Sequence, residues 1–509
     1  MNRGLRKSAF IVTGLVASFS LFLVVEHIRG RVSLSRYKAN LVASGVNLAP
    51  RGFHAASRDP TNGIQLVSDG IRNLTAGRLL PNDIHPPMVL LPSGHAVAGY
   101  LEETWESQTL SNAWDQVAQD VEKNRGALGQ IMAGLGQPVI ESDIDFRQGP
   151  KLEIPLLKSL KPLARWLAAA AELELSKRNT AAAAPFYEAE IRLPHLVAAQ
   201  NMVISELVRT LLASIARGAT WEALQSPAWH DNDLARLQNA WEMQSFSVEM
   251  LRSLEAEFRD VDPGFAMFRA SNDDAFMMLF GMETYFPIDQ ADWPVWEKCV
   301  RHFPYGEQIA LFVKRQIYCR IWRFAWLDQH ECYYLNAALR LAKALRSANA
   351  ARSYAPARRE VEALESAQEN RNFYNRLRFP SSSSPLKMSR VIEKAMRAET
   401  ERSIDICALA IQRFFLREGR FPDSLQSLVP DYVKSVPIDY MDGNPIRYRL
   451  QAEAGFILYS VGDDGRDDGG DPSLATGRVN EKSVWDRRDF VWPAAATAEE
   501  LKVYRAHVH

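Results

Sequence analysis

The sequence predicts a mainly α-helical protein with one transmembrane helix at its N-terminus, a large helical body and a small C-terminal α+β domain. Three features predict this class: an uncharged apolar run over residues 9–25, helical periodicity over residues 97–379, and a long helical pattern followed by two alternating strands after residue 386. The composition, 47% hydrophobic and 24% charged over 509 residues, is that of a globular protein large enough for several domains.

The apolar run AFIVTGLVASFSLFLVV carries no charge, and Arg3, Arg6 and Lys7 precede it. Its 17 residues just reach the length that spans a bilayer as a helix. A cleaved signal peptide is the alternative, but the following VEHIRGRVSL offers no small-x-small cleavage site. We therefore expect residues 1–30 to form a cytoplasmic tip and an uncleaved transmembrane anchor.

Residues 31–96 are expected to form a juxtamembrane connector of loops and short elements. They contain six prolines, which interrupt regular structure: Pro50, Pro60, Pro81, Pro86, Pro87 and Pro92. Lys and Arg lie on both sides of the apolar run, so the positive-inside rule does not decide the orientation of the anchor.

Residues 97–379 are predicted to form the helical domain. Its clearest segment is a helical hairpin in which Leu160, Leu163 and Leu167 share one face, with a polar break at 178–180 and Thr180 as the N-cap of the second helix. The alanine-rich hairpin resembles a tetratricopeptide unit, although no clean 34-residue period is present. Further helices are expected over residues 201–225, 233–261, 306–327 and 331–349.

Several residues of this domain invite functional interpretations. Trp221, Trp229 and Trp241 are expected in the core rather than on a ligand, because aromatic residues at helical spacing usually pack. His330-Glu331-Cys332 has no partner at zinc spacing and is interpreted as a detail of the core or of a helix surface. The four cysteines show no C-x-x-C spacing; they are interpreted as buried hydrophobic residues, with a bridge from Cys299 to Cys319 or Cys332 as the alternative.

A serine- and proline-rich linker at residues 380–385 separates the helical domain from a C-terminal domain at 386–494, and residues 495–509 form a tail. The C-terminal domain begins with one long helix that ends before Gly419, which suits the left-handed C′ position. Residues 446–450 and 456–460 alternate in hydrophobicity and are joined by a short loop, so they predict a β-hairpin.

The order of the long helix, REGRFPDSLQSLVP, DGNPIRYR and FILYSVGDDGRDDGGD resembles the globular domain of the major pseudopilin of type II secretion systems. This resemblance covers about 80 of the 509 residues. The chain departs from the family because no pseudopilin leader motif precedes the apolar run, so it is not expected to assemble as an ordinary pilus subunit. The whole chain also resembles membrane-anchored helical proteins of planctomycete- and verrucomicrobium-like bacteria.

The acidic loop after the hairpin is predicted to bind Ca²⁺. Five aspartates lie within nine residues, and glycines between them allow the chain to fold back toward a hard cation. The spacing does not match an EF-hand, and a solvated acidic turn is the alternative. The pseudopilin resemblance implies Asp464 and Asp471 as side-chain ligands and Val461 and Gly469 as carbonyl ligands. Asp463, Asp467 and Asp468 are the second choices.

These features lead us to expect a membrane-anchored protein of the bacterial envelope, with a helical scaffold and a Ca²⁺-binding pseudopilin-like domain, associated with a secretion or pilus-like system. Because such calcium sites require abundant Ca²⁺, the body is expected outside the cytoplasm, next to the inner membrane. The balanced charge, 60 basic and 61 acidic residues, argues against a nucleic-acid partner. A membrane-bound hydrolase with its site in the helical domain is the alternative, although no G-x-S-x-G, P-loop or H-E-x-x-H motif is present.

Overall fold

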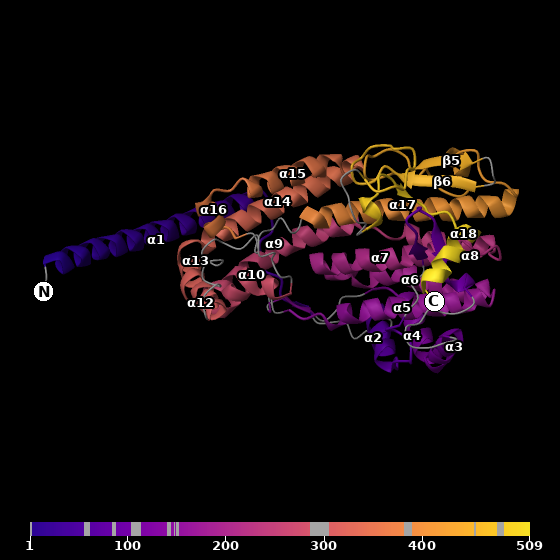
Figure 1. The fold of residues 1–509 in the computed structure, drawn as a ribbon, viewed down its shortest axis with the longest axis horizontal. Coiled ribbons are helices and arrows are strands. Elements are labelled where there is room, and N and C mark those ends of the chain that lie inside the picture. Colours follow the sequence, from indigo (N-terminus) through magenta and orange to yellow (C-terminus); the bar gives the residue numbers. More distant parts are fainter. Residues whose placement is uncertain are drawn as a thin grey trace.

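The computed structural model describes residues 3–54, 62–83, 88–102, 113–139, 144–146, 148, 152–285, 305–380, 389–451, 455–475 and 483–508. Helix accounts for 69% of the structure, so the predicted mainly α class is confirmed. Figure 1 shows an elongated arrangement in which the first helix projects from one end of a helical body, whereas the strands β5 and β6 lie toward the other end.

The N-terminal helix α1 spans Arg3–Ala43 and is one uninterrupted helix of 41 residues. Its side chains are exposed from Phe10 to Phe22, and burial begins at Leu23 and Glu26. The helix continues beyond residue 30, where a connector was predicted to start, because its second half carries an amphipathic pattern that buries Leu34 and Leu41. The first proline after the apolar run is Pro50, seven residues beyond the end of the helix.

The first part of the body is built from helices that pack in pairs. They are α2 (Gly63–Asn73), α3 (Ala113–Lys123), α4 (Arg125–Leu135), α5 (Pro155–Ser176), α6 (Thr180–Arg192), α7 (Val203–Ala223), α8 (Asp231–Glu242), α9 (Ser247–Ala270) and α10 (Asn272–Tyr285). Two short antiparallel strand pairs accompany them: β1 (Phe53–His54) with β4 (Ile144–Asp145), and β2 (Met88–Leu90) with β3 (Ala96–Ala98).

The predicted helical hairpin is present as α5 and α6, which pack against each other. The N-cap of α6 is Asn179 rather than Thr180: the Asn179 side chain accepts a hydrogen bond from the backbone N–H of Ala182. Asn is a better N-cap than Thr, so the cap falls one residue earlier than predicted. Tetratricopeptide-type repetition stays a prediction.

The single helix predicted over residues 233–261 is wrong, because the chain breaks between α8 and α9. At this break the carboxylate of Glu399 accepts hydrogen bonds from the backbone N–H groups of Phe246 and Ser247, at 2.8 and 3.0 Å. Glu399 therefore caps the start of α9 from a distant part of the chain. The helix break could not be predicted from the sequence, because the apolar pattern continues through it and the capping residue, Glu399, is far away in the chain.

The second part of the body begins at residue 305. Its helices are α12 (Gly306–Phe312), α13 (Cys319–Ala325), α14 (Leu327–Ala351), α15 (Ala355–Glu369), α16 (Phe373–Arg378), α17 (Ser389–Glu418) and α18 (Ala498–Val508). One π-helical turn, Val313–Tyr318, joins α12 to α13, so the helix predicted over 306–327 is present with a local irregularity.

The C-terminal region forms the predicted hairpin and adds a third strand. Strands β5 (Arg447–Gln451) and β6 (Gly455–Ser460) pair in antiparallel register, with Tyr448 opposite Leu458, and β7 (Phe490–Val491) pairs with the other edge of β6. Two residues are too few for a period-two signal, which is why β7 was not predicted. Gly419 adopts the predicted left-handed conformation after α17, with φ of +69°.

Helix α17 packs against α7, α8 and α9, so the C-terminal region shares one hydrophobic core with the helical body. Trp221, Trp229 and Trp241 lie in this core as expected, and each indole N–H donates a hydrogen bond, to Pro493 O, Ala223 O and Thr220 Oγ1 respectively. Cys319 and Cys407 are buried, and Cys319, Cys332 and Cys407 are free thiols. Cys299 and linker residues 381–385 lie outside the described residues.

Candidate functional site

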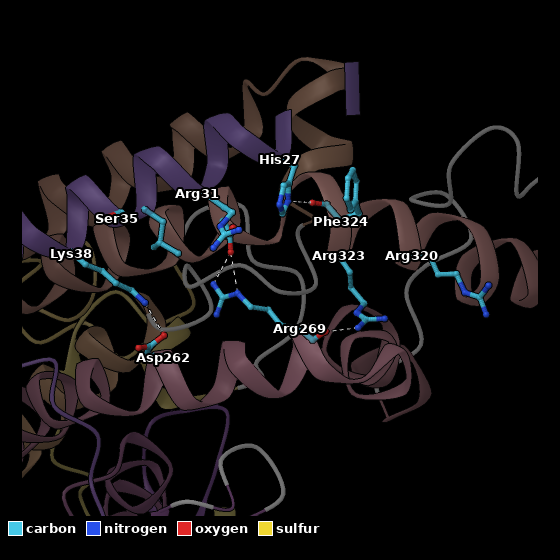
Figure 2. Close-up of a pocket in the computed structure, with 11 residues that line it drawn as sticks. His27, Arg31, Ser35, Lys38, Asp262, Arg269, Arg320, Arg323 and Phe324 are labelled. Atoms are coloured by element: carbon cyan, nitrogen blue, oxygen red, sulfur yellow. Dashed lines mark hydrogen bonds and ion pairs between the residues drawn. The ribbon is translucent and has the colours of Figure 1, made fainter. Parts of the chain in front are cut away.

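A cavity of about 810 Å³ opens where α1 joins the body (Figure 2). Helices α1, α9, α13 and α14 supply its walls. Five of its lining side chains are cationic (Arg31, Lys38, Arg269, Arg320 and Arg323) and two are anionic (Asp262 and Asp328). We call it the cationic cavity. This excess of positive charge in one concave site is the feature that an anionic ligand would require.

The inner wall of the cationic cavity is an ion-pair network around Glu331. The Glu331 side chain is fully buried, and its carboxylate pairs with Lys38 at 2.5 Å and with Arg269. Arg269 also pairs with Asp328 at 2.7 Å, and Lys38 with Asp262 at 2.7 Å. Burial raises the pKa of the Glu331 carboxyl, and the two cations only partly oppose that rise.

Three arginines line the cavity outside this network. Arg323 donates to the backbone carbonyl of Phe268 at 2.8 Å, which uses part of its guanidinium. Within the described part of the chain, Arg31 and Arg320 form no ion pair. Figure 2 shows Arg323 between Arg31 and Arg320, so the three positive charges are spread along the cavity.

His27 and Phe324 close the cavity on the side where α1 leads back toward its N-terminus. Their rings stack with centroids 4.8 Å apart, and His27 Nδ1 lies 2.7 Å from the Phe324 carbonyl oxygen. This contact fixes α13 against α1. The π-helical turn immediately precedes α13, which carries Arg320 and Arg323, and such turns are frequent at functional sites.

The cationic cavity was not predicted from the sequence, although part of its signal was visible. Lys314, Arg315, Arg320 and Arg323 interrupt an otherwise apolar helix, and α1 carries cations just after its apolar run. Their convergence depends on tertiary packing between segments almost 300 residues apart. His330 and Glu331 prove to be core residues, as expected, and His330 is enclosed by aromatic rings that include Phe265 and Trp322.

The acidic loop predicted to bind Ca²⁺ has arginine partners for several of its carboxylates. Asp463 pairs with Arg397 of α17, with Nε to Oδ1 at 2.8 Å, yet burial still raises the pKa of Asp463. Arg488 lies 3.3 Å from Asp468 and 3.6 Å from Asp471. These contacts already neutralise part of the charge that was expected to require a cation.

The other predicted ligands also have protein partners. Asp464 accepts the backbone N–H of Arg466, and Asp467 accepts the Tyr459 hydroxyl at 3.0 Å. Val461 is buried, and the Gly469 carbonyl accepts a hydrogen bond from Arg449 at 3.3 Å. Among the residues that the structure describes, no three His, Cys, Asp or Glu side chains converge as a metal site. Calcium binding at this loop stays a prediction.

The residue that organises the acidic loop is Asp489, which sequence reasoning missed. Its side chain is fully buried and accepts backbone N–H groups from Gly470 at 2.7 Å and Asp471 at 3.0 Å. Asp489 lies outside the acidic cluster in the sequence, next to strand β7. One signal of its role is visible in the sequence: Asp489 directly precedes the apolar residues of β7, where an ordinary surface aspartate is not expected.

A second cluster of titratable side chains lies inside the helical body. Glu172, Glu190 and Glu222 come from α5, α6 and α7, and all three are fully buried. Burial raises the pKa values of all three carboxyls well above normal, because the protein interior disfavours their charged form. Glu222 also accepts the backbone N–H of Tyr100 at 2.7 Å, which ties the short segment around residue 100 to α7.

Comparisons with known proteins found no matching family model, no matching curated protein and no matching solved structure.

Proposed function

We propose that this protein is a single-pass membrane protein of the cell envelope that holds a helical binding platform at the bilayer surface. The observation that carries the proposal is the division of α1 into two parts. The part up to Phe22 exposes apolar side chains, whereas the part from Leu23 onward packs into the body. Of the helices described, α1 alone is long and apolar enough to span a membrane.

The junction between the two parts supports a rigid attachment. Glu26 is buried and accepts a hydrogen bond from Gln329 of α14 at 2.9 Å. Gly30 lies so close to α14 that an added Cβ would be 3.0 Å from Gln329 Cγ. Because no loop separates the apolar run from the core, the body is held at a fixed height and angle to the membrane.

A platform function, rather than hydrolysis, suits the cationic cavity. Its charged side chains are arginine, lysine and aspartate. Lys38 and Arg269 are held in ion pairs, whereas Arg31 and Arg320 form none among the described residues, and this arrangement suits anion binding rather than nucleophilic attack. The pseudopilin resemblance of the C-terminal region supports a partner in a secretion or pilus-like assembly. In this proposal the edge strand β5, with exposed Arg449 and Leu450, offers the surface for that partner, and the body lies outside the cytoplasm.

Two truncations test the attachment. The full chain is expected to resist carbonate extraction from membranes, and a chain that starts at Leu23 is expected to be soluble and to unfold cooperatively. A chain that starts at Ser44 is expected to be unstable, because it lacks the core side chains Leu34 and Leu41. Extraction of the full chain by carbonate would contradict the anchor.

Photo-crosslinking from position 449, on strand β5, tests the platform. Absence of any protein adduct in cells would contradict a partner at this surface.

A further inference from the structure

We propose that the cationic cavity binds the phosphate groups of anionic phospholipids from the bilayer around α1. The inference deepens the proposed function and rests on α1 crossing the membrane. The wall of the cationic cavity carries more cations than anions. Two of these cations are neutralised by ion pairs: Lys38 pairs with Asp262 and Glu331, and Arg269 pairs with Asp328 and Glu331. Among the described residues, Arg31 and Arg320 form no ion pair. The cavity therefore keeps positive charge that no described side chain neutralises.

The cationic cavity begins just after the apolar run of α1. Arg31 follows the last residue of the apolar run, Val25, by six residues, or about 9 Å along a helix. The polar headgroup layer begins where the hydrocarbon ends and is roughly 5–8 Å thick on each side of a bilayer. His27, about 3 Å past Val25, therefore lies within the headgroup layer, and Arg31 lies just beyond its outer edge, where a long arginine side chain still reaches a headgroup phosphate. Figure 2 shows Arg320 beyond Phe324, toward the N-terminal side of α1 and thus toward the membrane.

Apolar side chains of α1 remain exposed next to residues that line the cavity. On α1, Ile28 and Val32 remain exposed although they lie past the charged end of the apolar run. An apolar rim beside a cationic cavity matches a ligand that joins acyl chains to an anionic head.

Four of the five cations that line the cavity are arginines. Guanidinium groups present planar donors that fit phosphate oxygens, and arginine is favoured where such oxygens are bound. Basic pockets beside membrane helices are known to receive anionic headgroups. The charges are spread from Arg31 to Arg320, so the arrangement fits a headgroup with spread charge or two neighbouring headgroups better than one compact ion.

The test uses the full chain in detergent, titrated with short-chain phosphatidylglycerol and monitored by native mass spectrometry and thermal melting. Wild type is expected to bind this lipid and to gain several degrees in Tm. Replacement of both Arg31→Gln and Arg320→Gln is expected to weaken binding about tenfold, the loss of at least one charge-assisted contact. Arg36→Gln is the matched control, because Arg36 is exposed on α1 and does not line the cavity.

Three further arms decide the source of the phosphate and the role of charge. Short-chain phosphatidylcholine, which has no net charge, is expected to bind much more weakly. Inorganic phosphate is expected to give no comparable gain in Tm. Equal binding of both lipids, unchanged binding in the double variant, or inorganic phosphate as effective as phosphatidylglycerol would each overturn the proposal. If the double variant fails to fold by circular dichroism, the Arg320→Gln single variant carries the comparison.

A failure of this proposal is distinguishable from a failure of the anchor. Lipid binding is measured in detergent, where no bilayer has to be crossed, whereas carbonate extraction reports the anchor without reference to the cavity. If the chain resists carbonate extraction but does not bind phosphatidylglycerol, the proposed membrane anchor stands and the proposed lipid site is wrong.

Discussion

The carboxylate of Glu331 on α14 lies 2.5 Å from the ammonium group of Lys38 on α1, and this ion pair joins the N-terminal helix to the core of the body. Glu331 is fully buried, whereas the Lys38 side chain keeps 24% of its surface exposed. The pair therefore lies at the base of the cationic cavity, with the carboxylate on the core side. The Lys38–Glu331 ion pair therefore both attaches α1 to the body and sets part of the charge of the cationic cavity.

Removing the Glu331 charge is expected to destabilise the protein. In Glu331→Gln, Lys38 and Arg269 lose the anion between them. We expect a loss of about 2 kcal/mol in unfolding free energy, less than the roughly 3–5 kcal/mol of a fully buried pair, because both cations are partly exposed. Chemical denaturation measures this. Glu122→Gln is the control, since its pair with Arg125 is exposed and should change stability by less than about 0.5 kcal/mol. Equal effects of the two substitutions would contradict the network.

Stability is expected to fall as pH rises from about 5 to about 7. Burial raises the pKa of Glu206 and of Glu257 to about 7, so the folded protein holds protons that the unfolded chain releases from about pH 4.5 upward. Each such group contributes at most about 1.4 kcal/mol per pH unit within this window. The trend should be visible in denaturant unfolding at a series of pH values.

Glu257→Gln is expected to reduce that slope and to stabilise the protein at pH 7. The amide oxygen can still accept the hydrogen bond that Val203 N–H donates to Glu257, while no charge has to be buried. Glu255→Gln, on the exposed face of the same helix, should leave the slope unchanged. An unaltered slope in Glu257→Gln would show that this carboxyl is already ionised.

Asp489→Asn is expected to loosen the acidic loop without unfolding the body. Gly470 and Asp471 both donate their backbone N–H groups to Oδ2 of Asp489, and Asp468 donates its N–H to Oδ1 at 3.4 Å. Asparagine has a single acceptor oxygen, so its NH2 group faces the donors on one of these two sides, and they lose their acceptor. We expect a cost of about 1–3 kcal/mol. Faster hydrogen exchange confined to residues 461–475 would support this, and unchanged exchange there would contradict it.

Calcium binding at the acidic loop, predicted from the pseudopilin resemblance, has to compete with Arg488. Arg488 lies close to both Asp468 and Asp471, so Arg488→Gln is expected to enlarge the rise in Tm on adding Ca²⁺, compared with EDTA. Asp471→Asn is expected to remove that rise. If neither wild type nor Arg488→Gln responds to Ca²⁺, the loop is a turn held together by arginine and backbone contacts.

The elements predicted from local patterns match the structure best. The hairpin of β5 and β6, the Gly419 terminus of α17 and the buried tryptophans each depend on residues close in sequence. The features that were missed depend on distant partners. Glu399 caps α9 from 153 residues away, and Leu34 and Leu41 extend α1 because they pack against the body.

Dependence on distant partners also explains why the sequence predicted a site at the acidic loop and did not predict the cationic cavity. Five aspartates in one segment are visible in the sequence, but the arginines that pair with them, Arg397 and Arg488, come from a helix and a strand-edge segment elsewhere. The cations of the cavity are likewise divided between α1, α9 and α13. Ion pairs between distant segments form only when the chain folds, so a pattern within a short stretch of sequence cannot predict them.

The most direct test of the account is a spin-label scan along α1 in phospholipid nanodiscs, with native cysteines replaced. We expect oxygen accessibility, as in lipid, at positions 10–22, a change to polar-reagent accessibility near His27 and Arg31, and a continuous helical period to Ala43. A break in the period near residue 30, or water exposure across positions 10–22, would contradict an anchor built into the core of the body.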